Sequence, residues 1–291
     1  MRKLTLLFTL VIAAAFAFGQ FKMAEPKKCL GNDQYQTVSQ PVNYKAGGDI
    51  LWSEDFDATD WSASVDPETN FLISPDLMPA GWKVFDANGE NFYWHWSQVG
   101  PRGRYTSMVA VNPNSPTAAE LLTSHNPSTD AVDLLASTTA ANGVMMLESD
   151  YYNTTPSGAM VATPINMDSY IMTPVIDLSA AAGAHLVWQQ RFRFCCSAVN
   201  SKLDVLVSTD YDEANPDAAH WTTFDARFGT LTNAYQTENP KVCRIDLSAI
   251  AAGFSNVRIK WQQTAASHYV WTIDDIRSEE HTSELQSPNT I

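Results

Sequence analysis

Short runs of apolar, β-branched and aromatic residues recur along most of this chain, and turn-forming residues separate them. Long helical periodicity is nearly absent, whereas short runs bounded by Pro, Gly, Asn and Asp are typical of β-strands. The pattern predicts an all-β fold, a two-sheet antiparallel jelly-roll sandwich with one long loop insertion. We expect strands at residues 50–56, 81–85, 93–97, 144–148, 168–172, 185–194, 202–208, 241–246, 257–262 and 269–276.

The run at 185–194 alternates between two kinds of residue, with period two. Leu186, Trp188 and Phe192 fall on one face of the expected strand. The opposite face carries His185, Gln189, Arg191 and Arg193. Because successive side chains of a strand point to opposite faces, half of this strand is expected to face water.

The sequence Asp-Leu-Ser-Ala occurs twice, at 177–180 and at 246–249. Each copy is followed by a glycine and then by a run that contains Trp-Gln-Gln. The likeness is too short for a repeat protein. We therefore expect one kind of corner to be used twice, once in each sheet.

The first 19 residues have the features of a secretory signal peptide. Arg2 and Lys3 precede an apolar run, and small residues lie just before a cleavage point at Gln20. The run is too short for a membrane-spanning helix, which needs about 18 or more apolar residues. The mature chain would then consist of a lead-in segment at 20–48 and a domain at 49–276. We expect it to be secreted or at the cell surface, without insertion into the membrane.

The other end of the chain does not look like part of the domain. Residues 277–287 resemble the in-frame translation of a sequencing-library adapter, and they form a polar stretch without an apolar period. We expect the natural domain to reach Ile276 and residues 277–291 to be an artefactual tail. The alternative is a natural polar tail.

The charge balance limits the possible partners. With 32 acidic and 18 basic residues the chain has a formal net charge of −14. This charge opposes binding to a nucleic-acid backbone or to an anionic membrane surface. A nucleic-acid partner is therefore not expected.

Residues 101–142 interrupt the strand pattern with a stretch rich in Ser, Thr, Ala, Pro and Asn. A connection of this length is longer than an ordinary loop in a compact domain. Two roles stay open for it, a binding loop or a variable flap.

A series of short motifs carries a family resemblance. They are ILWSEDFD at 50–57, PAGW at 79–82, DANGE at 86–90 with Trp94, NGV at 142–144 with ES at 148–149, YIMTPVIDL at 170–178, VLVST at 205–209, IDLS at 245–248 and IDDI at 273–276. In this order they resemble the strand signatures of cleaved-adhesin or choice-of-anchor J jelly-roll domains, relatives of the MAM domain, over about residues 49–276. The resemblance implies an exported, non-catalytic module of a bacterial surface or secreted protein, which serves adhesion, carbohydrate or protein binding, or accessory duty beside a peptidase.

Acidic residues gather at the ends of two runs that a jelly roll would place side by side. Glu54, Asp55 and Asp57 end the first run, and Asp274 and Asp275 lie in the last one. Calcium prefers six to eight oxygen ligands of this kind, and alternation gives Glu54 and Asp275 the parity of core residues. We expect a structural calcium site here, which the family resemblance also implies. The alternative is a set of solvated strand ends in an acidic protein.

A second possible metal site lies in the segment 86–90. Asp86, Asn88 and Glu90 place oxygens at alternate positions around a glycine, as in the first half of a calcium loop. The distal glutamate of such a loop is missing. A plain Asn-Gly hairpin turn is the alternative.

The four cysteines allow disulfides in an exported chain. Cys195 and Cys196 are adjacent and would point to opposite faces of a strand, so they would join different partners. Cys243, in a later run, is the most plausible partner, and Cys29 lies in the lead-in segment. Structural or free thiols are favoured over a metal site or a nucleophile.

Enzyme motifs are incomplete. Glu148 and Asp150 approach the Glu-x-Asp-x-x-Glu arrangement of jelly-roll glycosidases, but Asn153 replaces the last glutamate, so that one of the two required carboxylates is missing. We therefore expect no catalysis, and a jelly-roll glycoside hydrolase is the least unlikely enzymatic alternative. Tyr105, Tyr151 and Tyr152 are candidates for an exposed ligand platform beside the insertion.

These observations lead to one functional prediction and two alternatives. The chain is predicted to be a secreted or cell-surface binding module of adhesin type, stabilised by calcium, for an extracellular glycan or protein. It could instead be an accessory domain of a larger secreted enzyme such as a peptidase, or the glycoside hydrolase just described.

Overall fold

The computed structural model describes residues 48–64, 75–98, 101, 134–153, 161–193, 202–228, 235–265 and 270–280. All of them belong to the compact unit Tyr35–Ile291. The strands are β1 (Ile50–Glu54), β2 (Lys83–Asp86), β3 (His95–Ser97), β4 (Val144–Leu147), β5 (Met167–Met172), β6 (Ala184–Arg193), β7 (Lys202–Ser208), β8 (Thr222–Asp225), β9 (Lys241–Asp246), β10 (Arg258–Ala265) and β11 (Val270–Glu280). The helices are short: α1 (Ala58–Trp61), α2 (Ser149–Tyr152) and the 3₁₀ turns η1 (Ser62–Ser64), η2 (Pro75–Leu77) and η3 (Pro216–Ala218).

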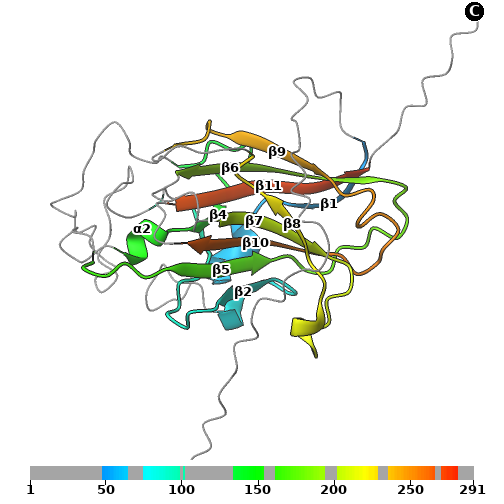
Figure 1. The fold of residues 1–291 in the computed structure, drawn as a ribbon. Helices are drawn as coiled ribbons and strands as arrows, with labels where there is room; N and C mark the ends of the chain where they lie inside the picture. The colour runs from blue at the N-terminus through cyan, green and yellow to red at the C-terminus, as the bar shows by residue number, and fades with distance from the viewer. Residues whose placement is uncertain are drawn as a thin grey trace, which may run out of the picture. The chain divides into compact units, whose positions relative to one another are not determined.

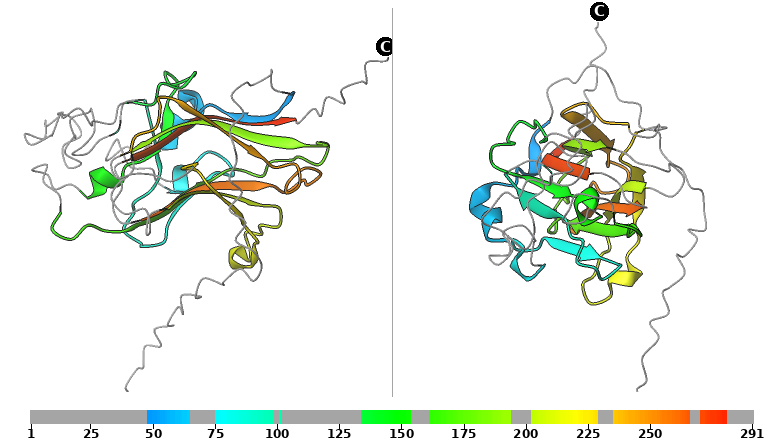
Figure 2. Two further views of the ribbon diagram at one scale, coloured as in Figure 1. Left: turned by 45° about the horizontal axis from the view of Figure 1, so that its top comes forward. Right: turned by 90° about the vertical axis from the view of Figure 1, so that its left-hand side faces the viewer.

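The strands form two antiparallel sheets, which lie as two layers in Figure 2. The six-stranded sheet has the order β3-β4-β11-β6-β9, with β1 also paired to β11, and the five-stranded sheet has the order β2-β5-β10-β7-β8. The predicted all-β, two-sheet antiparallel sandwich is confirmed. One strand, β8, was not predicted, because its four residues TTFD form a short, mostly polar edge strand.

The first and last strands are neighbours, as predicted. β1 pairs with β11, and the Cα atom of Glu54 lies opposite that of Ile276 (Figure 1). β11 continues four residues beyond the predicted end at Ile276, because residues 277–280 pair with β6 and residues 277–279 also pair with β1. The proposed adapter origin of residues 277–287 stays a prediction, and residues 281–291 lie outside the described part of the chain.

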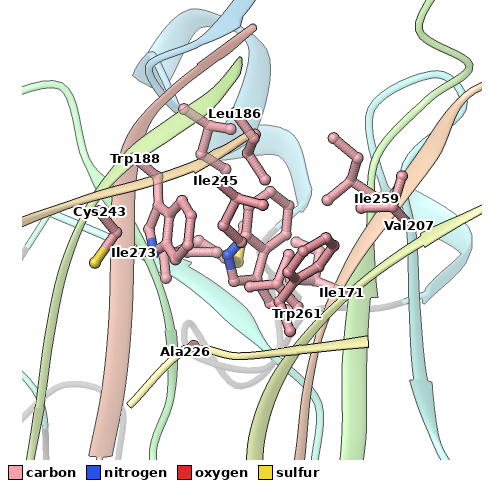
Figure 3. Close-up of a cluster of buried hydrophobic side chains, with 14 of the residues drawn as sticks. Ile171, Leu186, Trp188, Val207, Ala226, Cys243, Ile245, Ile259, Trp261 and Ile273 are labelled. Atoms are coloured by element: carbon pink, nitrogen blue, oxygen red, sulfur yellow. The ribbon is translucent and has the colours of Figure 1, made fainter. Parts of the chain in front are cut away.

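The inner faces of the two sheets pack on each other through large aromatic side chains (Figure 3). Trp188 and Trp271 from the six-stranded sheet are fully buried, as is Trp261 from the five-stranded sheet. The side-chain oxygen of Gln190 accepts hydrogen bonds from the indole nitrogens of Trp188 (3.1 Å) and Trp271 (3.0 Å), and its nitrogen donates to the carbonyl of Ala226 (2.8 Å). Gln190 thus supplies buried partners for the indole nitrogens of Trp188 and Trp271, whereas the indole nitrogen of Trp261 has no hydrogen-bond partner among the described residues.

The repeated Asp-Leu-Ser-Ala motif forms the same corner twice. Asp177 accepts a hydrogen bond from the backbone N–H of Ser179, and Asp246 accepts one from that of Ser248, both at 2.9 Å. The first corner leads from β5 to β6 and the second from β9 to β10. Each corner therefore carries the chain from one sheet to the other, whereas the sequence suggested one corner in each sheet.

The prediction that half of β6 faces water was wrong. All ten residues of β6 are buried, including His185, Gln189, Arg191 and Arg193 on its outer face. Gln189 donates to the hydroxyl of Thr138 (2.8 Å), and Arg191 donates to the side chain of Gln236 (3.0 Å). Segments distant in sequence, around Thr138 and Gln236, cover the outer face of β6. The alternation of residues within a strand cannot predict that other segments will cover it.

Cys243, the most plausible partner if Cys195 or Cys196 forms a disulfide, is a free thiol that is fully buried in the core, in line with the expectation of structural or free thiols. The expected signal peptide, Cys29, Cys195, Cys196 and insertion residues 102–133 lie outside the described residues. No helix in the described ranges is long and apolar enough to cross a membrane.

Candidate functional site

Three of the five predicted calcium ligands contact one loop, residues 137–142, which precedes β4. Asn142 donates from its side-chain amide to Asp55 (3.2 Å). The hydroxyl of Ser137 donates to Asp274, and the backbone N–H of Thr138 donates to Asp275 (2.8 Å). Asp274 and Asp275 therefore lie together where the end of the insertion meets β11, and Asp55 contacts the same loop at Asn142.

Glu54 and Asp57 have other partners. One carboxylate oxygen of Glu54 accepts from the backbone N–H of Phe56 (2.7 Å) and from the indole nitrogen of Trp61 (3.0 Å). Asp57 caps α1 by accepting from the backbone N–H of Thr59 (2.7 Å), and hydrogen bonds from the side chain and the backbone of Thr59 lower the pKa of its carboxyl. Burial, in contrast, raises the pKa of Glu54. These two acids hold the local chain around α1.

Asp275 does not have the core parity that the sequence suggested. The register between β11 and β6 shifts between Asp274 and Arg277, and Asp275 has a φ of 49°. This bulge turns Asp275 toward the loop and gives the buried inward position to Ile276. Asp275 also accepts hydrogen bonds from Gln189 (2.7 Å) and the hydroxyl of Thr139 (2.8 Å).

Asp274 is the most enclosed acid of this group. Asp274 is fully buried, and its carboxylate oxygen Oδ1 has no hydrogen-bond partner among the described residues. Burial raises the pKa of Asp274 to about 7. Within the described ranges, however, no three His, Cys, Asp or Glu side chains are arranged to hold a metal ion. The five predicted ligands thus do not converge as one group.

The predicted second metal site does not fit the donors around it. The carboxylate of Asp86 accepts hydrogen bonds from three backbone N–H groups, those of Asn88 (3.1 Å), Glu90 (2.9 Å) and Phe92 (3.1 Å). The side-chain amide of Asn88 donates to the carbonyl of Asn166 (2.6 Å). N–H groups that point at the carboxylate would point at a cation bound there. Asp86 therefore organises a turn, in line with the alternative interpretation of this segment.

The predicted tyrosine platform is partly packed. Tyr152 stacks on Phe92 with ring centroids 4.4 Å apart, and its hydroxyl donates to the carbonyl of Tyr93 (3.0 Å). Tyr151 is half-buried and lies edge-on to Tyr152, with centroids 5.7 Å apart. Tyr152 is thus half-buried and packed on Phe92, and a ligand platform at Tyr151 and Tyr152 stays a prediction. Tyr105 lies outside the described residues.

The two acids of the glycosidase alternative are enclosed. Glu148 is fully buried and lies 3.0 Å from the ring nitrogen Nε2 of His95, while Asp150 is 6% exposed. Asn153, which replaces the missing glutamate, is buried and accepts from the backbone N–H of Ile165 (2.7 Å). These contacts hold the α2 segment against its neighbours.

The outer face of the five-stranded sheet carries an aromatic row that the sequence did not single out. Phe85 on β2 stacks on Tyr170 of β5, with ring centroids 5.3 Å apart and an angle of 26° between the ring planes. The ammonium of Lys260 on β10 lies 4.7 Å from the centroid of Tyr170 and 4.3 Å from that of Trp221. Tyr211 lies beside Trp221, with centroids 6.0 Å apart. We call these five residues the outer row.

The outer row is only partly covered. Phe85 is 49% exposed at the edge of the sheet, and the other four residues are half-buried. Burial raises the pKa of Tyr170 to about 12 and lowers that of Lys260 to about 8. At neutral pH the row therefore presents a neutral phenol beside an ammonium ion, next to an open aromatic ring.

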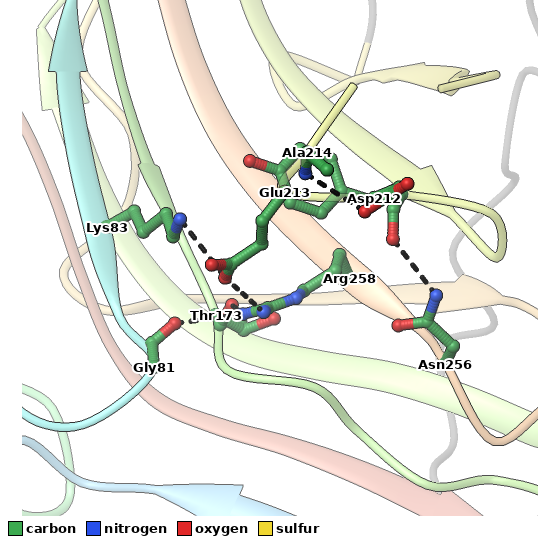
Figure 4. Close-up of polar contacts among 9 residues, drawn as sticks. Gly81, Lys83, Thr173, Asp212, Glu213, Ala214, Asn256 and Arg258 are labelled. Carbon is green, nitrogen blue, oxygen red and sulfur yellow. Dashed lines mark hydrogen bonds and ion pairs between the residues drawn. The ribbon is translucent and has the colours of Figure 1, made fainter. Parts of the chain in front are cut away.

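The loop that supplies Tyr211 and Trp221 is fastened to the sheet from below (Figure 4). Arg258 is buried and donates to the carbonyls of Gly81 (2.8 Å) and Thr173 (2.7 Å) and to Glu213 of this loop (3.2 Å). Glu213 also pairs with Lys83 of β2 (3.1 Å). These contacts fix the loop, and with it the two aromatic rings, relative to β2, β5 and β10.

Sequence reasoning missed the outer row for a structural reason. Alternation places Phe85 and Tyr170 on the outward side of their own strands, opposite the buried Val84 and Ile171. The row depends on the strand order β2-β5-β10, which joins segments far apart in the chain. The available signal was the presence of two outward aromatic residues in strands that were otherwise correctly predicted.

Comparison with known proteins finds similarity in solved structures alone. No family model matches the chain, and no curated protein matches it in sequence. The K1 cleaved adhesin domain of Lys-gingipain from Porphyromonas gingivalis W83 has 17% identity and a TM-score of 0.38, over 79% of this chain and 98% of that one. The K3 domain of the same protein has 15% identity and a TM-score of 0.37, over 81% and 100%.

A xylan-binding CBM22-1 domain from Paenibacillus barcinonensis Xyn10C is similar at 10% identity and a TM-score of 0.30, over 81% of this chain and 97% of that one. These identities and TM-scores are too low to assign a function.

Proposed function

We propose that this protein is a non-catalytic binding module that acts outside the cell, and that the outer row is its recognition surface. The observation that supports this most is the half-exposed stack of Phe85 and Tyr170 beside the Lys260 ammonium. Aromatic rings with polar neighbours bind both sugars and proteins well, because they offer apolar area and hydrogen bonds together. The signal-peptide features and the family resemblance of the sequence point to the same role.

A glycosidase role has less support. Hydrolysis needs two carboxyl groups that flank the sugar bond. Glu148 is fully buried against His95, and Asn153 occupies the place of the second acid. Neither position offers a free carboxylate to a substrate.

The binding role can be tested with the full mature chain on an array of glycans and extracellular-matrix proteins. We expect at least one ligand whose binding is lost in the double variant Tyr170→Ala/Trp221→Ala. Phe254→Ala is the matched control, because Phe254 is 48% exposed, much like Phe85, and in the described part of the chain it makes no ring contact with the outer row. Equal binding by the double variant and the wild type would contradict the proposal.

We also propose that calcium stabilises the module at Asp274 and Asp275 of β11, without Asp55, whose exposed carboxylate accepts from the side chain of Asn142. The buried and unpartnered oxygen Oδ1 of Asp274 supports a cation here, since a buried carboxylate is costly without a partner. Calcium would there neutralise the carboxylates and join β11 to the loop 137–142. Glu54 and Asp57 leave the proposed set, because their carboxylates serve the chain around α1.

Chelation tests this second proposal. We expect a chelator to lower the melting temperature of the wild-type protein by several degrees, as for any ligand that binds the folded state alone. The same chelator should leave Asp274→Asn unchanged. A wild-type melting temperature that ignores the chelator, with no metal in the purified protein, would remove calcium from the proposal.

A further inference from the structure

The ammonium of Lys260 lies against aromatic rings, and among the described residues it feels the charge of Asp168 without forming an ion pair with it. It lies 4.7 Å from the centroid of Tyr170 and 4.3 Å from that of Trp221, and among the described residues it makes no hydrogen bond or ion pair. Cation–π contacts of this kind fix an ammonium but leave its N–H groups without acceptors. Lys260 therefore offers hydrogen-bond donors at a fixed position in the outer row.

The neighbouring cations differ in this respect. Arg258, two residues earlier on β10, donates to two backbone carbonyls and to Glu213 (Figure 4). Lys83 pairs with the same glutamate. Both are occupied in fastening the loop, whereas Lys260 is available to a ligand.

Hydrogen-bond acceptors also lie beside Tyr170, on β5 and β10. Gln262 donates from its amide nitrogen to one oxygen of Asp168 (2.8 Å), which orients both side chains. In the described part of the chain, the amide oxygen of Gln262 and the second oxygen of Asp168 accept no hydrogen bond from another residue. Both residues are half-buried on the outer face, Gln262 directly opposite Tyr170 in the register.

We propose that the ligand of the outer row is a neutral glycan, with sugar rings against Phe85 and Tyr170 and hydroxyl groups between Lys260 and the acceptors of Gln262 and Asp168. A hydroxyl group both donates and accepts hydrogen bonds, so it suits a face that offers the donors of Lys260 and the acceptors of Gln262 and Asp168. This inference rests on the proposed function and names the ligand class for it.

The charges around the row disfavour an acidic ligand. A carboxylate, sulfate or phosphate would gain Lys260 but would approach Asp168 and Asp217, which both act on the neighbouring phenol of Tyr170. The net charge of −14 would repel a polyanion at longer range. A neutral polyol is repelled neither by these two aspartates nor by the net charge.

The test uses the full mature chain and calorimetric titration with defined probes. Oligosaccharides derived from xylan, cellulose and mannan are the neutral probes, and polygalacturonate and heparin fragments are the acidic ones. Lys260→Met keeps the length of the side chain but removes its donors, and Lys202→Met, an exposed lysine on β7, is the matched control. We expect the wild type to bind a neutral probe, Lys260→Met to bind it at least tenfold more weakly, and Lys202→Met to bind it as the wild type does.

The outcomes separate the two proposals. If Tyr170→Ala/Trp221→Ala loses the neutral probe while Lys260→Met retains full affinity, the role of Lys260 is wrong and the binding face stands. If the wild type binds only acidic probes, or binds a protein but no glycan through this face, the neutral-glycan inference is wrong. If the double variant binds a glycan as well as the wild type, the recognition surface itself is wrong.

Discussion

The outer faces of the two sheets are built on the same alternation but end in different environments. On the six-stranded sheet, Val144 and Met146 of β4 point outward and are fully buried under Leu135. On the five-stranded sheet, Phe85 and Lys260 point outward and stay partly exposed. Strand alternation therefore determines which side chains point outward, while segments from elsewhere in the chain determine whether water reaches them.

The cover also changes what the polar residues do. Gln189 and Arg191 on the covered face are used for internal hydrogen bonds to Asp275, Gln236 and Thr138. Lys260 on the open face has no such partner among the described residues. We therefore place recognition on the open face and structural cohesion on the covered face.

Truncating one apolar residue on each face should give the largest contrast. Met146→Ala removes a fully buried side chain and is expected to lower the free energy of unfolding by about 2–5 kcal/mol. Phe85→Ala removes a half-exposed ring that stacks on Tyr170, and about 1 kcal/mol is expected. Urea unfolding of both variants measures the difference. Equal losses would mean that the two faces are equally covered.

A pH series sharpens the comparison, because the open face also holds a buried acid. Burial raises the pKa of Asp204 on β7 from 3.8 to about 6, and the facing Asp225 of β8 adds to this. Folding then favours the protonated acid, so stability from this group is present below pH 4 and is lost as the pH rises through about 6. At about 1.36 kcal/mol for each pKa unit, the loss at neutral pH is about 3 kcal/mol at most.

Asp204→Asn should remove this loss. We expect the variant to be more stable than the wild type at pH 7, and the two proteins to converge near pH 4, where the wild-type acid is protonated. Urea unfolding across this pH range gives the difference. A difference that does not change with pH would show that Asp204 is ionised without cost in the folded protein.

Two glutamines make a matched pair across the two faces. Gln189 is 7% exposed and donates to Asp275, while Gln262 is half-exposed and donates to Asp168. Gln189→Ala is expected to cost about 2 kcal/mol, because a buried hydrogen bond to a charged group is lost. Gln262→Ala should cost less than about 1 kcal/mol, because water replaces the lost donor. Thermal and urea unfolding of the two variants measures both losses. A larger loss in Gln262→Ala than in Gln189→Ala would mean that Gln262 is the more enclosed of the two.

The strands were predictable because alternation is local. Runs such as 202–208 and 241–246 were predicted with the bounds of β7 and β9, and the pairing of β1 with β11 followed from the expected jelly roll. β8 escaped because TTFD has little apolar pattern. The extension of β11 was not predicted, because Arg-Ser-Glu-Glu has no strand pattern of its own and is extended through its pairing with β1 and β6.

The candidate site was less predictable, because it depends on contacts between distant segments. The bulge at Asp274–Arg277 shifts the parity of Asp275, and no local pattern announces it. The loop 137–142 donates hydrogen bonds to Asp55, Asp274 and Asp275, whereas the indole of Trp61 donates one to Glu54. The outer row similarly requires the strand order, so alternation could give the direction of Tyr170 but not its neighbours.

The smallest expected effect tests how the open face is held. Lys83 and Glu213 pair at 3.1 Å with side chains 36% and 58% exposed, so water screens the pair and Lys83→Met should change the free energy of unfolding by less than about 1 kcal/mol. Glu213 keeps its contact with the buried Arg258, which also holds two backbone carbonyls. Trp221 should therefore stay in place, and ligand binding should be unchanged in Lys83→Met at both low and high salt. A large loss of binding with little loss of stability would instead make Lys83 part of the recognition surface, and the contrast between fastening cations and the free Lys260 would then disappear.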